Sequence, residues 1–182
     1  MEELEDPTES LHERIHESAH HAAEKGKNKW IVYVALTTAI IAVLSAITSL
    51  LAAHAADETM LSQIKASDQW AYYQAKGIKT DILISETKTL QAMGQTPPAE
   101  DVAKIKDNKK QQEEISKKAK EFEEESKLND DKHNTLARSV TLFQIAIAIG
   151  AISILIKKRI YWLISLGFAG VATFYFVMEL LG

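Results

Sequence analysis

Two long stretches almost without charged residues constrain this chain more than any other feature of its sequence. Residues 30–56 contain no Asp, Glu, Lys or Arg, and residues 139–182 contain only the Lys157–Arg159 cluster and Glu179. About 20 consecutive apolar residues span the hydrocarbon core of a bilayer, and a soluble core helix rarely has so long a run. The sequence therefore predicts an all-α integral membrane protein, with three transmembrane helices at 30–56, 140–156 and 161–181.

Two basic clusters predict the orientation of these spans. Three lysines lie between residues 25 and 29, directly before the first span, and the Lys157–Arg159 cluster separates the second span from the third. Lys and Arg next to short loops favour the cytoplasmic side. We therefore expect a multi-pass protein with a cytoplasmic N-terminus and with residues 57–139 outside the cytoplasm.

The extramembrane segment 57–139 has the pattern of a long antiparallel helical hairpin. Two series of residues follow 3-4 spacing on either side of a turn near residues 94–98, where Gly and Pro gather. Such heptad runs are typical of a coiled coil. Folding the hairpin about residue 96 sets Asp68 opposite Ser126 and Ile78 beside Ile115. The first predicted contact series is Leu61, Ile64, Asp68, Ala71, Ala75, Ile78, Ile82, Ser85, Thr89 and Ala92; the second is Ile105, Asn108, Gln112, Ile115, Ala119, Phe122, Ser126, Asn129, His133, Leu136 and Val140.

A second stripe on the first arm predicts an interface between copies of the chain. It contains Trp70, Tyr73 and Gly77, and its continuation through the first span is made of small residues, which let membrane helices approach closely. The alternative is that this small face packs on the other two spans of the same chain, but that leaves Trp70 and Tyr73 without a partner. The predicted interface residues are Ala35, Thr38, Ala42, Ser45, Ser49, Ala52, Trp70, Tyr73 and Gly77.

The segment 67–76, with the sequence SDQWAYYQAK, is distinctive. With its His-rich tail, one early span, a helical hairpin and two late spans, the chain resembles a bacterial membrane-protein family catalogued as a domain of unknown function, number 4337. The resemblance covers nearly the whole chain and implies a bacterial membrane protein, which we expect in the inner (plasma) membrane. It implies no activity and no catalytic residues.

The acidic N-terminal tail, residues 1–29, contains one candidate metal site. His12, His16 and His20 follow one another at intervals of one helical turn, and two imidazoles one turn apart can share a divalent ion. The alternative is a polar tail without a fixed structure, because a third fixed ligand and a supporting shell are missing. No other cofactor is expected.

Three classes of function remain after the motifs are considered. No nucleophile–base pair is recognisable, which disfavours an enzyme, and a net charge of −4 without a basic patch disfavours nucleic-acid binding. The favoured hypothesis is a self-associating scaffold in the lipid bilayer whose hairpin is a stalk or a partner-binding surface. The alternatives are an oligomeric channel lined by Thr38, Ser45 and Ser49, and an accessory subunit of a larger membrane complex.

Overall fold

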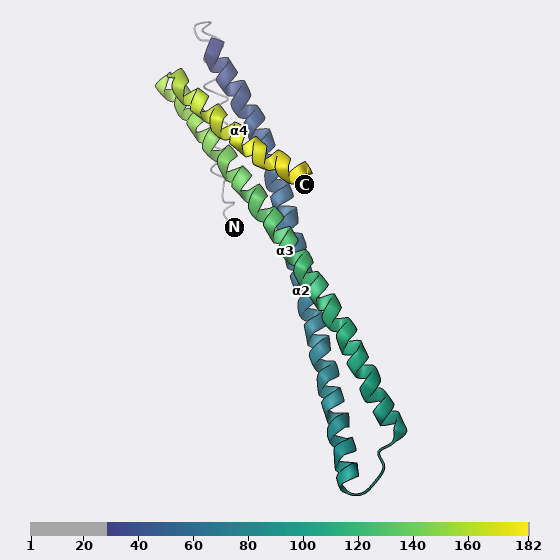
Figure 1. Ribbon diagram of the computed structural model, residues 1–182. Helices are drawn as coiled ribbons and strands as arrows, with labels where there is room; N and C mark the ends of the chain where they lie inside the picture. Colours follow the sequence, from purple (N-terminus) through teal and green to yellow (C-terminus); the bar gives the residue numbers. More distant parts are fainter. Residues whose placement is uncertain (1–28, 182) are drawn as a thin grey trace, which may run out of the picture. The chain divides into compact units, whose positions relative to one another are not determined.

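A computed structural model describes residues 29–181, and over this range the chain folds into three helices (Figure 1). Helix α2 runs from Lys29 to Ala92, α3 from Ala99 to Ile156 and α4 from Arg159 to Leu181. Each is long and apolar enough to cross a membrane. The prediction of an all-helical chain with three membrane-compatible helices is confirmed in these terms.

The helices form two compact units, which we describe separately. The hairpin unit comprises residues 54–131, and the three-helix unit comprises the described residues 29–53 together with 132–181. Helices α2 and α3 contribute to both units. Neither helix is interrupted between its polar and its apolar part, as the unbroken heptad pattern predicts.

The three-helix unit packs through small residues and one large aromatic side chain. Phe143 and Ala146 of α3 are fully buried against Ala169 and Ala172 of α4 and Ile41 of α2. Small side chains bring helix backbones close together, which is how helices associate where lipid removes the hydrophobic driving force. The large residues of α2 point the other way, where we expect lipid: Leu36, Ile40, Val43, Ile47 and Leu50 are all exposed.

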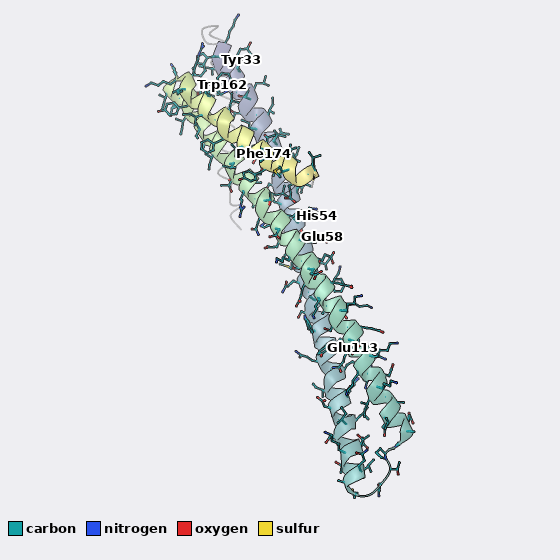
Figure 2. All side chains as sticks on the ribbon, viewed as in Figure 1. Tyr33, His54, Glu58, Glu113, Trp162 and Phe174 are labelled. Atoms are coloured by element: carbon teal, nitrogen blue, oxygen red, sulfur yellow. The ribbon has the colours of Figure 1, made fainter. Side chains whose placement is uncertain are left out.

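Side-chain hydroxyl groups form hydrogen bonds between the three helices. The buried Ser139 Oγ donates to the carbonyl oxygen of Ala172 at 2.8 Å, and the buried Ser165 Oγ donates to that of Ala146 at 2.7 Å. The indole nitrogen of Trp162, labelled in Figure 2, donates to Thr37 Oγ1 at 3.1 Å. Each bond joins two helices, so the hydroxyls fix how α2, α3 and α4 are rotated against one another.

At the turn of the hairpin unit, a glycine conformation and backbone hydrogen bonds end α2 and start α3. Gly94 has a φ of 73°, a left-handed conformation that costs glycine little. The amide of Gln95 donates to the carbonyl of Leu90 at 2.9 Å and that of Gly94 to Gln91 at 3.0 Å, which is the Schellman pattern of a helix end. The carbonyl of Pro98 then accepts the first bond of α3, from Asp101 at 3.0 Å.

An ion pair supports the first turn of α3. Lys104 Nζ lies 2.7 Å from Glu100 Oε1, and this hydrogen bond lowers the pKa of the Glu100 carboxyl and raises the pKa of the Lys104 ammonium. A carboxylate in the first turn also interacts favourably with the helix dipole. Both groups are exposed, so the pair marks the helix start rather than holding the unit together.

Candidate interaction site of the hairpin unit

Three contacts between side chains and facing helices define how α2 and α3 pair in the hairpin unit. Ser126 Oγ donates to the carbonyl of Thr59 at 3.2 Å, Gln112 Nε2 to the carbonyl of Tyr73 at 3.3 Å, and Lys76 Nζ to Asn108 Oδ1 at 3.3 Å. Residue numbers rise on α2 as they fall on α3. The two helices therefore run antiparallel, as the hairpin hypothesis predicts.

The buried face of α2 keeps one heptad phase over most of its length. Within the hairpin unit this face is made of small residues, and its most buried members are Ala55, Ser62, Ala66, Thr80 and Thr87. Within the three-helix unit the buried positions fall in the same seven-residue frame. They are Ile31, Val34, Thr38, Ile41, Ser45, Thr48 and Ala52.

The predicted contact series is therefore right for α3 and wrong for α2. On α3, Ile115, Ala119, Ser126 and Leu136 are buried as expected. On α2, the series that begins at Leu61 lies on the outside, and Ile78 is 62% exposed whereas its predicted neighbour Ile115 is 7% exposed. The physical reason is that α2 is one unbroken helix whose buried positions keep the seven-residue frame of its apolar part, where small residues face the other helices.

The predicted register of the hairpin is also wrong. Ser126 was expected opposite Asp68, but its hydroxyl bonds to the carbonyl of Thr59 and, at 3.2 Å, to Gln63 Oε1. Asp68 is exposed. Ser126 therefore meets α2 five to nine residues before the position expected from a simple fold about residue 96.

The predicted interface between copies assumed that Trp70 and Tyr73 have no partner within the chain, and the same packing shows that this assumption is wrong. Trp70 Nε1 donates to Glu123 Oε1 of α3 at 2.8 Å, and the Tyr73 carbonyl accepts from Gln112, so both residues have partners within the chain. Gly77 also faces α3, since a Cβ built on it would lie 2.9 Å from Gln112 Nε2.

The membrane part of that predicted interface likewise packs inside the chain. Thr38, Ser45 and Ala52 are buried within the three-helix unit, Ala35 and Ala42 are half-buried, and Ser49 alone is exposed. The hydroxyls of Thr38 and Ser45, proposed as the lining of a channel, are thus turned toward the chain's own helices.

The packing leaves an apolar stripe on the outer face of α2. We call it the outer stripe; its members are Leu61, Ile64, Ala71, Ala75, Ile78 and Ile82. The four large residues are 45–62% exposed. Two residues along an α-helix correspond to a rotation of about 200°, so Ile64, two residues before the buried Ala66, and Ile78, two before the buried Thr80, point away from α3.

The outer face of α3 is chemically different. It is exposed and charged, and Figure 2 shows polar side chains projecting along it. A shallow groove beside the seam is also of mixed charge, with Glu113 between lysines, so it does not select one class of ligand. The charged face carries Lys110, Glu114, Lys117, Glu121 and Glu124; the groove is lined by Tyr73, Lys109, Gln112, Glu113, Ser116, Lys117 and Lys120.

The structure does not describe the candidate metal ligands of the N-terminal tail. His12, His16 and His20 lie outside the described residues. Between residues 29 and 181, no group of three or more His, Cys, Asp or Glu side chains is placed to hold a metal ion.

Comparison with known proteins gives a family without a described activity. A family model described as a domain of unknown function (DUF4337) matches residues 30–182. Because the match covers most of the chain, the protein belongs to this family, as the resemblance in segment and layout implied. No curated protein and no solved structure matches significantly.

Proposed function

We propose that this protein is a non-enzymatic, self-associating membrane scaffold whose hairpin unit binds a second helix through the outer stripe of α2. The outer stripe is the observation that carries the proposal. Water-exposed heptad positions are normally polar, whereas here two pairs of large aliphatic side chains, Leu61 with Ile64 and Ile78 with Ile82, lie exposed at heptad positions, with Ala71 and Ala75 between them. An exposed apolar surface with this spacing matches the knobs of a coiled-coil partner.

The proposal places the hairpin unit on the extracytoplasmic side, as the basic clusters predict. It replaces the interface first expected from the sequence, because the small-residue face of α2 is occupied by the chain's own helices. The burial of Thr38 and Ser45 among the chain's own helices counts against a channel lined by these residues. An accessory subunit would use the same stripe on a foreign helix.

Mass measurement of the purified protein, in mild detergent and in lipid nanodiscs, tests the proposal. We expect the wild type to form a single oligomer and Ile78→Ser to raise its dissociation constant about tenfold or more, because a truncated anchor in an apolar contact costs at least about 1.4 kcal/mol. The matched control is Leu128→Ser, which alters an equally exposed aliphatic residue of α3 and is expected to leave assembly unchanged.

A wild type that stays monomeric at every concentration would contradict self-association. A foreign subunit that co-purifies with the wild type and is lost in Ile78→Ser would replace the scaffold with the accessory-subunit hypothesis. Far-ultraviolet circular dichroism shows that each variant retains its helices, so that loss of assembly is not confused with unfolding.

A further inference from the structure

The outer face of α2 is complementary to itself when a second copy runs in the opposite direction. In one register, large residues face small ones along the whole stripe: Ala71 lies opposite Ile82 of the second copy, and Ala75 opposite its Ile78. The layers farther from the centre of the pair also set a large residue against a small one, except that the Asp68 carboxylate lies opposite the hydroxyl of Ser85. The remaining layers are Leu61 with Ala92, Ile64 with Thr89 and Asp68 with Ser85.

The residues that flank the stripe are complementary in the same register. The exposed Lys65 lies near Glu86 of the second copy, and the exposed Tyr72 near its Lys79. The first is a pair of opposite charges and the second places an ammonium beside an aromatic ring. In coiled coils, such flanking pairs determine the choice of partner and the orientation of the helices.

Other arrangements of two copies lose this complementarity. In a parallel pair, each residue meets itself, so Asp68 faces Asp68 and the Ala71 and Ala75 layers leave gaps. Asp81 then also lies near Glu86 of the other copy, which adds a repulsion between like charges. Sliding the antiparallel pair by one heptad in either direction places Lys79 against a second lysine.

We propose that the outer stripe of α2 binds the outer stripe of a second copy in antiparallel orientation, with Ala75 against Ile78. The inference rests on the proposed function and adds the partner, the direction and the register.

Cysteine crosslinking in mild detergent tests the direction and the register together. The chain contains no Cys, so single substitutions give clean sites. Ala71→Cys and Ile82→Cys are purified separately, and a short thiol crosslinker is added after mixing. We expect a crosslinked dimer from the mixture and none from Ala71→Cys alone, because two residues 71 lie about 16 Å apart along the antiparallel pair.

A charge exchange provides an independent readout in detergent. Lys65→Glu is expected to weaken the dimer about two- to fivefold, as for an exposed ion pair, and Lys65→Glu with Glu86→Lys is expected to restore it. Restoration is the decisive result, since Lys65 also lies 5.5 Å from the Phe122 ring centroid of its own chain and the single variant disturbs that contact too.

The outcomes separate this inference from the proposed function. Self-crosslinking of Ala71→Cys shows a parallel dimer, which overturns the inference and leaves the scaffold standing. An oligomer in which Ala71→Cys and Ile82→Cys do not crosslink overturns the antiparallel register and leaves the scaffold standing. A wild type that is monomeric under all conditions overturns both the inference and the proposed function. The same holds if lipid covers the outer stripe of that monomer.

Discussion

At the scale of single residues, buried hydroxyls distinguish the seam of the hairpin unit from an ordinary apolar coiled coil. Ser126 of α3 uses its hydroxyl to reach α2, with both partners at 3.2 Å. Ser62 of α2 is fully buried in the same unit, yet its Oγ has no hydrogen-bond partner within the described part of the chain. A buried polar group without a partner destabilises the folded state, whereas a bonded one does not.

These two serines predict opposite effects for the same substitution. Ser62→Ala is expected to raise the free energy of unfolding by about 1 kcal/mol, because it removes an unsatisfied oxygen, and Ser126→Ala is expected to lower it by about 1 kcal/mol, because it removes a bonded one. Thermal unfolding in detergent, followed by circular dichroism, measures both. A loss of stability in Ser62→Ala would show that its hydroxyl has a partner, such as a bound water.

At the scale of helices, the sequence predicted the existence and pairing of the elements but not the face that α2 turns inward. The face of α3 was predictable because only one of its faces is apolar. Helix α2 has two faces that could form the seam with α3, and the larger apolar residues of one of them favour the wrong face. The unbroken helix from Lys29 to Ala92 keeps one heptad phase, and in lipid the small residues must face the other helices. Following that phase outward selects the correct face.

Close helix approach in the three-helix unit depends on Gly150 of α3. A Cβ at this position would lie 2.9 Å from Thr38 Oγ1 and 3.4 Å from Ser165 Oγ, and both belong to short side chains that have little room to move. At Gly77 the corresponding neighbour is the flexible end of Gln112, and at Gly167 no atom lies within 4 Å. Glycine is thus required by packing at one of these three positions.

The matched substitutions Gly150→Ala and Gly167→Ala test this difference. Gly150→Ala is expected to lower the free energy of unfolding by about 1 kcal/mol, as crowding of 1–3 kcal/mol outweighs the roughly 1 kcal/mol gained in helix propensity. Gly167→Ala is expected to raise it. Adding Thr38→Ala to Gly150→Ala should recover part of the loss, because the two sites are coupled through one contact. Equal effects of the two glycine substitutions would contradict the packing argument.

At the scale of the whole molecule, the structure adds a contact to the sequence argument for orientation. The Arg159 guanidinium lies 5.7 Å from the Trp30 ring centroid, so the start of α2 and the turn between α3 and α4 meet at one end of the three-helix unit. Tyr33 and Trp162 lie near that same end (Figure 2). The start of α2 and the Lys157–Arg159 cluster, which are far apart in sequence, therefore lie at one end of the three-helix unit, as the orientation expected from the two basic clusters requires.

Thiol labelling in intact cells tests the orientation that follows. A membrane-impermeant maleimide is expected to react with Thr96→Cys in the turn of the hairpin unit and not with Lys158→Cys in the basic cluster, because positively charged loops remain cytoplasmic. Labelling after detergent extraction controls for access to each site, and the absence of native Cys removes background. The reverse pattern would place the hairpin unit in the cytoplasm. Labelling of both sites would show that copies insert in both directions.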